Sequence, residues 1–342
     1  LGEMAYVSAC HAIACAGLEA KDIDLIIFGT CSMDEQVPNM ASGLQKRLGA
    51  SNAGAMDINT ACTSFLYGLT TGSAMIGQGV VKNVLVIGGE LISHLMDWTN
   101  RNVAVLFGDG CAAVVLQPTE GDEGVLADKL GCYGNVREIL QVHGWGQRYS
   151  NQGWVLGDTQ WVFEGQEIFK RAVVGMSHAC EDVLNSCSMG PDDIALVVPH
   201  QANLRIIEAV AKRAGVPMER VFVNVHRYGN MSAATVPVAL VEALEAKGAL
   251  NTTSIHNRTP MGRMGRPYVP GKDLEGVYDE PRTILKDIHS PLVAMANLMR
   301  VPITADLVCH DSHGRNGWVL DWAELGYAND PYGHFRICNA ER

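Results

Sequence analysis

The chain has 342 residues, of which 47% are hydrophobic, and carries a formal net charge of -11 at pH 7. This length allows two domains or one large duplicated domain, and the acidic balance excludes a general nucleic-acid-binding surface, which needs a basic face. No apolar run approaches the roughly 18 to 20 residues of a membrane span. The start lacks the features of a signal peptide, so we expect a cytoplasmic protein whose ten cysteines are reduced.

Short apolar runs alternate with longer segments of helical spacing through the first 250 residues. The runs 23–28, 84–87 and 194–198 are rich in β-branched residues and bounded by Gly, Asp or Pro, which predicts buried strands. Helices are predicted at 4–16, 40–48, 64–75, 165–184, 204–214 and 234–246. Strands that alternate with helices in this way indicate a layered α/β fold with mainly parallel strands.

One strand-turn-helix pattern occurs twice. Residues 22–27 recur as 193–198, and each copy leads through a turn to a helix that ends in a basic pair and a glycine, at 46–49 and 212–215. The period is too long for a solenoid. It suggests two related halves, 1–120 and 121–250, packed about a pseudo-dyad with a site where they meet. Chance similarity of two buried strands is the alternative.

Cys62 lies where a short strand gives way to the helix predicted at 64–75. A thiol at a helix start faces the positive end of the helix dipole, which favours the thiolate and makes it a nucleophile. Its neighbours Ala61 and Thr63 are small and leave room for a substrate. A cysteine on an apolar helix is also a common core residue.

Two polar residues of the second half, like Cys62 in the first, lie close to the ends of predicted strands or the starts of predicted helices. His200 directly follows the strand predicted at 194–198, and the carboxyl ends of such strands are where ligands bind. Asn230 follows Gly229, which permits a tight turn, and its amide can donate hydrogen bonds. Taken singly, His200 could be a structural residue, and Gly229-Asn230 could be a turn and helix cap.

The three segments together resemble β-ketoacyl-acyl carrier protein synthase III, a family of the thiolase superfamily. The resemblance covers roughly residues 3–248 and is carried by the segments 57–65, 108–115, 163–176, 199–207 and 229–235. It implies a thiolase-like fold of two related halves in layers of the order αβαβα.

The resemblance implies catalysis by Cys62, His200 and Asn230 without a metal or cofactor. Cys62 would take an acyl group from acyl-CoA. The acyl-enzyme would then be attacked by the carbanion that malonyl-acyl carrier protein forms on losing carbon dioxide. Neutral His200 and Asn230 would donate hydrogen bonds to the enolate oxygen, and one such donor contributes roughly 3 to 4 kcal/mol. The family is also dimeric, and Val37 matches a position that shapes the acyl pocket across the dimer interface.

A basic island should receive the acidic carrier protein. Arg205 and Lys212 are seven residues apart on the predicted helix 204–214 and share one face, with Arg213 beside them. The family resemblance points to Arg205 in particular. For Lys212 and Arg213, a solvated helix face is an equally good interpretation.

Beyond about residue 250 the family pattern ends. The family's first strand and its final glycine-rich turn are not found, so we expect a thiolase-like fold that is incomplete at both ends. The tail 251–342 has a Gly/Pro/Arg-rich linker at 259–272, a helix predicted at 283–299 and a strand at 303–308. We expect it to be loosely attached or independently packed.

Two further interpretations concern the tail and the function as a whole. Cys309, His310, Asp311 and His313 cluster in sequence, but they have no second cluster at zinc spacing, which favours scattered surface residues. The alternative to an enzyme is a non-catalytic, truncated or fused thiolase-fold protein that dimerises or binds acyl carrier protein. The intact catalytic set favours the enzyme, and the missing segments favour the alternative.

Overall fold

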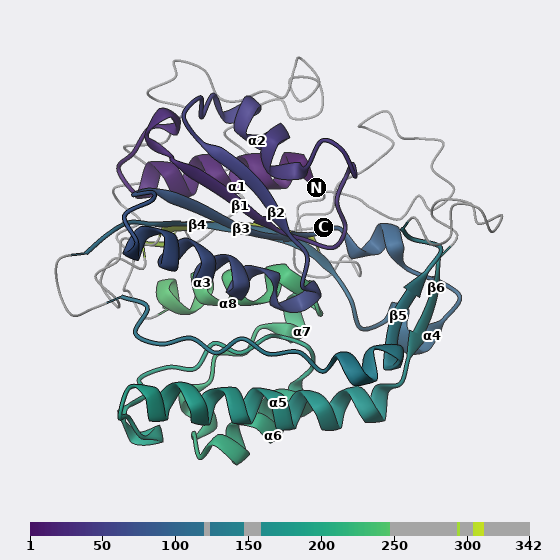
Figure 1. Cartoon of the computed structure of the whole chain (residues 1–342). Coiled ribbons are helices and arrows are strands. Elements are labelled where there is room, and N and C mark those ends of the chain that lie inside the picture. Colours follow the sequence, from purple (N-terminus) through teal and green to yellow (C-terminus); the bar gives the residue numbers. More distant parts are fainter. Residues whose placement is uncertain (120–123, 147–158, 247–292, 295–303, 311–342) are drawn as a thin grey trace.

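The computed structural model describes residues 1–119, 124–146, 159–246, 293–294 and 304–310 (Figure 1). All six predicted helices are present, with ends within a few residues of those expected: α1 (Gly2–Cys15), α2 (Met40–Leu48), α3 (Ser64–Gly77), α5 (Gly165–Ser186), α6 (Leu204–Ala214) and α8 (Thr235–Ala246). The short helices α4 (Arg101–Ala104) and α7 (Val225–Tyr228) lie in the connections. Within the described ranges, no helix combines the length and apolar character that crossing a membrane requires.

The main sheet has six strands in the order β2-β1-β3-β4-β8-β7. The strands are β1 (Leu25–Gly29), β2 (Gly54–Ile58), β3 (Val84–Glu90), β4 (Asp109–Leu116), β7 (Val293–Ala294) and β8 (Thr304–His310). β1 is parallel to both β2 and β3, whereas β4 is antiparallel to β3 and to β8. The strands predicted at 23–28 and 84–87 are therefore confirmed as β1 and β3.

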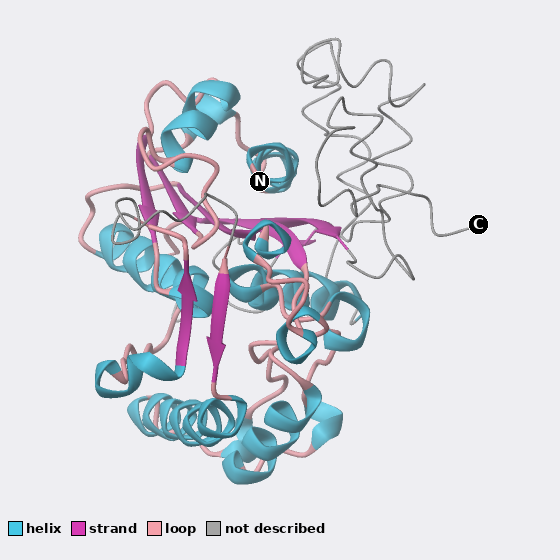
Figure 2. Cartoon of the chain, turned by 90° about the vertical axis from the view of Figure 1, so that its right-hand side faces the viewer, coloured by secondary structure: helices cyan, strands magenta, loops and turns pink. Residues whose placement is uncertain are grey.

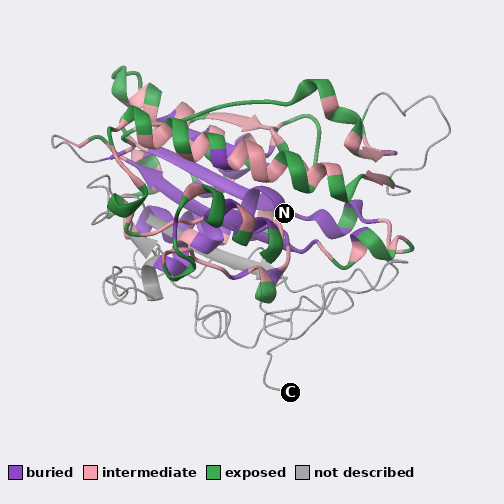
Figure 3. Cartoon of the chain, turned by 90° about the horizontal axis from the view of Figure 1, so that it is seen from below, coloured by how far each residue is buried: buried purple, intermediate pink, exposed green. Residues whose placement is uncertain are grey.

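Helices cover both faces of this sheet. Alternate β1 residues point to opposite sides, as strand geometry requires: Ile26 and Phe28 pack with α1 and α2, while Leu25 and Ile27 pack with α3 and α8. Figure 1 shows α1 and α2 above the sheet and α3 and α8 below it. Figure 3 shows that the strands between these helices are buried.

The second half lacks a matching sheet within the described residues. The prediction of a strand at 194–198 is wrong. In this segment the structure has a single parallel bridge, between Val197 and Val221. The apolar side chains of this segment are partly exposed. Beyond this bridge, α5 and α6 form the outer layer (Figure 1). The predicted αβαβα order is thus present with its second β layer reduced, and the boundaries near 120 and 250 remain predictions.

A separate two-stranded sheet joins β5 (Leu140–His143) to β6 (Gln160–Phe163), well apart from the main sheet (Figure 2). Trp161 of β6 donates its indole N–H to the carbonyl oxygen of Leu95 at 2.6 Å, and its ring centroid lies 5.0 Å from that of Phe107. These contacts attach the small sheet to the turns that follow β3.

The tail supplies a strand to the first half. β8 pairs antiparallel with β4, which confirms the strand predicted at 303–308 over its described residues. The expectation of an independently packed tail is wrong for this segment, because β8 satisfies backbone groups that β4 would otherwise present at a sheet edge. Val293–Ala294 form β7, so the helix predicted at 283–299 is wrong there. The remainder of that range and the linker 259–272 lie outside the described residues.

Candidate active site

Cys62 lies in a tight turn between β2 and α3. The turn is a 3₁₀ segment, Ala61–Thr63, and Ala61 has a φ of 50°, a left-handed conformation that a residue with a side chain rarely adopts. Ser64 fixes the turn: its hydroxyl donates to the carbonyl oxygen of Ala61 at 2.7 Å and accepts from the backbone N–H of Thr60 at 2.9 Å. The sequence correctly predicted a cysteine directly before a helix.

Two glycines allow the Cys62 turn and the segment after Asn230 to approach the sheet closely. A Cβ on Gly29 of β1 would lie 2.9 Å from the backbone of Ser64, at the start of α3. A Cβ on Gly88 of β3 would lie 2.5 Å from the carbonyl oxygen of Ala233. Only glycine fits at either position, so these two strands set the depth at which the Cys62 turn and the segment after Asn230 lie.

The thiol of Cys62 is held in its neutral form by its surroundings. Burial raises the pKa of Cys62 to about 11, a hydrogen bond with the Ser232 side chain lowers it, and the nearby charge of Glu90 raises it. The helix-dipole argument predicts a thiolate, but desolvation is the larger effect here. The resting side chain is therefore a thiol that needs a proton acceptor before it can act as a nucleophile.

Asn230 is positioned by the first half of the chain. Its backbone forms a bridge with Phe107, in which the Asn230 N–H donates to Leu106 O at 2.9 Å and the Gly108 N–H donates to Asn230 O at 3.1 Å. Its side-chain oxygen accepts from the Ser232 N–H at 2.9 Å. Because that contact fixes the orientation of the amide, the side-chain nitrogen is the group able to donate to a substrate.

His200 follows the Val197 bridge and is joined to α8. Its Nδ1 lies 2.5 Å from the hydroxyl oxygen of Thr235, and that hydroxyl also lies 2.9 Å from Ser232 O. Burial lowers the pKa of His200 to about 4, so the imidazole is neutral at physiological pH. A neutral ring suits a hydrogen-bond donor better than a proton acceptor.

Ser232 connects the three predicted residues. Hydrogen bonding to its side chain lowers the pKa of Cys62, its N–H binds the Asn230 side chain, and its carbonyl shares the Thr235 hydroxyl with His200. Ser232 has a φ of 47°, a second strained residue at this point. Ser232 therefore lies between the Cys62 turn of the first half and the segments of His200 and Asn230 in the second.

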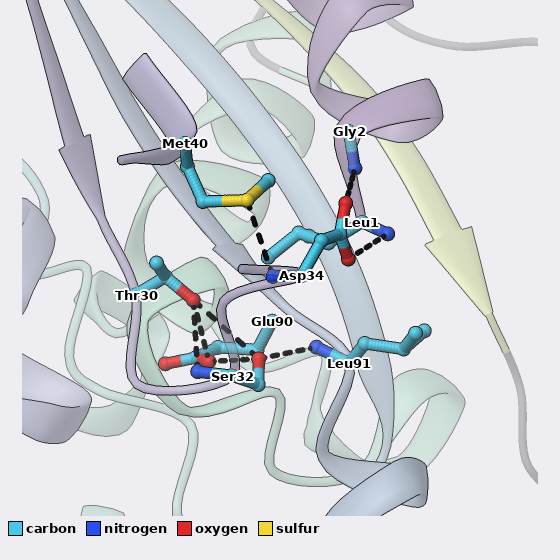
Figure 4. A network of polar contacts seen from close by, with 8 residues as sticks. All are labelled: Leu1, Gly2, Thr30, Ser32, Asp34, Met40, Glu90 and Leu91. Carbon is cyan, nitrogen blue, oxygen red and sulfur yellow. Dashed lines mark hydrogen bonds and ion pairs between the residues drawn. The ribbon is translucent and has the colours of Figure 1, made fainter. Parts of the chain in front are cut away.

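A buried carboxyl group that sequence reasoning missed lies beside Ser232, the residue that links these segments and is called the Ser232 hub below. Glu90 ends β3, and its carboxylate receives hydrogen bonds from Thr30, Ser32 and Ser232 (Figure 4 shows the first two). Cys31 adds its backbone N–H at 3.1 Å and its thiol at 3.3 Å. The sequence does show a charged residue at the end of an apolar strand, which could have marked Glu90. It gives no local sign that this strand lies beside residue 232.

The predicted docking residues lie on the surface. Arg205, Lys212 and Arg213 are exposed on α6, and Arg213 lies 3.2 Å from the imidazole of His178 on α5. Val37 is 89% exposed in the loop before α2. Within the ranges that the structure describes, no group of His, Cys, Asp and Glu side chains could hold a metal. The tail cluster of Cys309, His310, Asp311 and His313 falls outside the described side chains.

Two family models match this chain. The model of 3-oxoacyl-[acyl-carrier-protein] synthase III matches residues 56–134, which include Cys62, and the model of its C-terminal part matches residues 184–254, which include His200 and Asn230.

Similar proteins and solved structures agree with these models. A β-ketoacyl-[acyl-carrier-protein] synthase III 2 of Vibrio cholerae is 48% identical over 243 residues, or 71% of this chain and 67% of that protein. A β-ketoacyl-[acyl-carrier-protein] synthase III of Geobacillus kaustophilus is 43% identical over 71% of this chain and 74% of that protein. The crystal structure of the Aquifex aeolicus synthase III superposes with a TM-score of 0.66 at 38% identity, and the match covers 73% of this chain and 77% of that one.

Proposed function

Because this chain belongs to the 3-oxoacyl-[acyl-carrier-protein] synthase III family, we propose that Cys62, His200 and Asn230 are its catalytic residues. The chain is an acyltransferase of fatty acid synthesis that condenses an acyl group from acyl-CoA with malonyl-acyl carrier protein. The observation that carries the residue assignment is the Ser232 hub, which joins the thiol of Cys62 to the segments of Asn230 and His200.

Acyl transfer comes first. The Cys62 sulfur attacks the thioester carbonyl of acyl-CoA, the carbon–sulfur bond to CoA breaks, and CoA leaves as its thiol once it takes up a proton. The Ala61 turn presents the sulfur at the start of α3, where the helix dipole favours the negative charge that develops on attack.

Condensation follows on the acyl-enzyme. Malonyl-acyl carrier protein loses carbon dioxide, and the electron pair of the broken bond forms an enolate on its thioester. The side-chain N–H of Asn230 and the imidazole of neutral His200 donate to the enolate oxygen. The carbanion then attacks the acyl carbonyl on Cys62, the carbon–sulfur bond to the enzyme breaks, and the 3-oxoacyl product forms while the Cys62 thiolate takes up a proton.

The orientation of the His200 ring supports this role. The hydroxyl of Thr235 has one hydrogen, which it can donate either to Ser232 O or to Nδ1 of His200. When it donates to Nδ1, the ring hydrogen is on Nε2, which is the tautomer that can stabilise an enolate. Thr235 is therefore a positioning residue for His200.

Labelling with a radioactive short-chain acyl-CoA tests this function. We expect a covalent label on the intact chain, with none on Cys62→Ser. Cys180→Ser is a matched control, because it removes a half-buried thiol of α5 and should keep the label. An unlabelled wild-type chain would instead support the non-catalytic interpretation, which the similarity to synthase III enzymes does not favour.

Carrier-protein docking on α6 is part of the proposal. Arg205 is exposed on the helix that begins four residues after His200, so a carrier bound there would be close to the site. We expect Arg205→Glu to weaken carrier binding by about tenfold and to leave acylation from acyl-CoA unchanged. Lys46→Glu on α2, an equivalent helix on the other half, is the control. Equal carrier affinity of the Arg205→Glu variant and the wild type would show that Arg205 is an ordinary solvent-exposed residue without a role in docking.

The assembly and location of the enzyme are also proposals. Val37 is exposed just before Pro38, as expected of a residue that contacts a second copy of the chain in a homodimer and borders that copy's acyl pocket. Cys31, Cys62, Cys132, Cys180 and Cys187 are free thiols, which supports a reducing, cytoplasmic location.

A further inference from the structure

Acyl transfer needs a proton acceptor for Cys62, and the obvious candidate is a poor one. His200 would have to become a buried imidazolium, whereas burial lowers its pKa to about 4. Ionisation of Cys62 alone would place a second negative charge beside Glu90, whose carboxylate already raises the pKa of the thiol. The acceptor must therefore take the proton without adding a charge to the site.

Glu90 is connected to Cys62 by a single side chain. The Ser232 hydroxyl donates to Oε1 of Glu90 at 3.0 Å, and hydrogen bonding to the same side chain lowers the pKa of Cys62. Glu90 is fully buried, and burial raises its pKa above that of an ordinary glutamate. A carboxylate in such a position gains a proton more easily than one in water.

The hydrogens at this junction can be counted. In the resting site, the Cys62 S–H donates to the Ser232 oxygen, and the Ser232 O–H donates to the Glu90 carboxylate. Transfer of both hydrogens along these bonds leaves a Cys62 thiolate and a protonated Glu90, which now donates to Ser232. The cluster holds one negative charge before and after, so no second charge is buried.

The other groups that face Glu90 suit this exchange. Thr30 and Ser32 donate from the loop after β1, Cys31 donates its N–H and thiol from the same loop, and Asp109 on β4 interacts with it electrostatically. Burial and the charge of Glu90 raise the pKa of Cys31, so that this thiol stays neutral, and burial raises the pKa of Asp109 to about 6.

We propose, building on the function above, that the Ser232 hydroxyl passes the proton of Cys62 to Glu90 as the thiol attacks acyl-CoA. Glu90 returns the proton when CoA leaves, so the carboxylate is regenerated in each turnover. Ser232 touches the reacting sulfur, whereas Glu90 acts through Ser232. The left-handed conformations of Ala61 and Ser232 fix the two short turns that carry the Cys62 sulfur and the Ser232 hydroxyl.

The pH dependence of Cys62 reactivity tests the relay. Two rates are measured: single-turnover acylation by acetyl-CoA, and alkylation of Cys62 by iodoacetamide followed by mass spectrometry of its peptide. In the wild type, both should rise as Glu90 ionises and then stay level until the thiol itself ionises. In Glu90→Gln, they should rise about tenfold per pH unit without a plateau and fall at least about 100-fold below wild type at neutral pH.

Variants of Ser232 provide the matched pair. Ser232→Ala should lose the plateau, and Ser232→Cys, which keeps a transferable proton on an unbranched side chain at this left-handed position, should retain it. This pair decides the question even if Glu90→Gln fails to fold. A plateau retained in Glu90→Gln or Ser232→Ala would overturn the proposal. So would rates that drop equally at every pH, or a plateau that only His200→Ala removes, which would indicate a thiolate–imidazolium pair.

The two readouts separate this proposal from the function on which it rests. If acyl-CoA fails to label the wild type while alkylation shows the predicted plateau and its loss in the variants, the proposed function fails and the relay stands. If acylation occurs but neither rate depends on Glu90, the function stands and the relay is wrong.

Discussion

The two copies of the strand-turn-helix pattern take the same local structure but differ in their strands. Each begins with a 3₁₀ turn closed by a backbone N–H that donates to an aspartate at 2.8 Å: Glu19 to Asp22 in the first copy and Gly190 to Asp193 in the second. Each helix starts at an asparagine cap and ends at a left-handed glycine with a φ of 71°. Only the first copy forms a strand.

The difference lies in what surrounds each apolar run. β1 is paired along its whole length by β2 on one side and β3 on the other. Residues 194–198 have only the bridge to Val221 among the described residues. A cap is completed within a few residues of the chain, but a strand requires partners from elsewhere.

This contrast extends to the site. The first half positions Cys62 by a helix packed on a continuous sheet. The second half relies more on side-chain hydrogen bonds: the Thr235 hydroxyl holds His200, and Asn230 combines its backbone bridge to Phe107 with a side-chain contact to the Ser232 N–H. Gln201, which is fully buried, donates to Pro199 O and Phe222 O and accepts from the N–H groups of Asn224 and Val225. Glu242 accepts from Asn224 and Arg227 in the same region.

The largest expected effect separates the chemistry of the two halves. Cys62→Ser should abolish acylation. His200→Ala and Asn230→Ala should keep acylation measurable but reduce malonyl decarboxylation about 100- to 1000-fold, because they remove donors to the enolate. The two partial reactions are measured separately, by acyl label and by release of carbon dioxide. Equal losses of both reactions in all three variants would contradict the assignment of acylation to Cys62 and of decarboxylation to His200 and Asn230.

A change at Gln201 should show how strongly the second half depends on side chains. Gln201→Ala leaves four backbone groups without their partner and should lower the free energy of unfolding by about 2 to 4 kcal/mol. Asn83→Ala is the matched change in the first half. There Asn83 donates to Asp22 O and accepts from Gln117, but the sheet remains, and we expect a loss of about 1 kcal/mol. Urea titration of both variants measures the difference, and similar losses would weaken the contrast.

The two halves should also respond to pH in opposite directions. The folded pKa of His200, about 4, lies below its usual value, so its contribution to stability is present above pH 6.5 and is lost as the pH falls towards 4. Burial raises the pKa of Asp109 to about 6, so its contribution is present below pH 3.8 and is lost as the pH rises towards 6. Each amounts to roughly 3 kcal/mol.

Variants test this opposition. Because the two pH windows overlap, the opposing effects largely offset each other in the wild type between about pH 4 and 6. His200→Ala should therefore lose stability as the pH rises through this range, and Asp109→Asn should lose stability as the pH falls through it. Thermal unfolding followed across this range at constant ionic strength shows each slope. A slope that neither variant alters would assign the pH dependence to other groups.

The smallest expected effect concerns the feature that the two halves share. Gly49→Ala and Gly215→Ala should each destabilise by about 1 kcal/mol, because each places a side chain in the left-handed region. Gly43→Ala is the control: it lies inside α2 with open space around it and should stabilise by about 0.5 to 1 kcal/mol. Clearly unequal losses of stability in Gly49→Ala and Gly215→Ala would show that tertiary contacts, and not the local glycine alone, determine where α6 ends.

The sequence by itself determined the helices and their caps, and it pointed to the residues that we propose as catalytic. Asn39 and Asn203 cap helices, and Gly49 and Gly215 end them, through bonds that span three or four residues. Cys62, His200 and Asn230 could be identified because each lies in a segment that resembles the family.

Only the tertiary structure decided how these pieces are joined. β8 pairs with β4, Ser232 meets Glu90 across 142 positions of the chain, and burial holds Cys62 as a thiol despite its place before a helix. Strand pairing and desolvation depend on residues that are distant in sequence, and a local pattern does not contain that information.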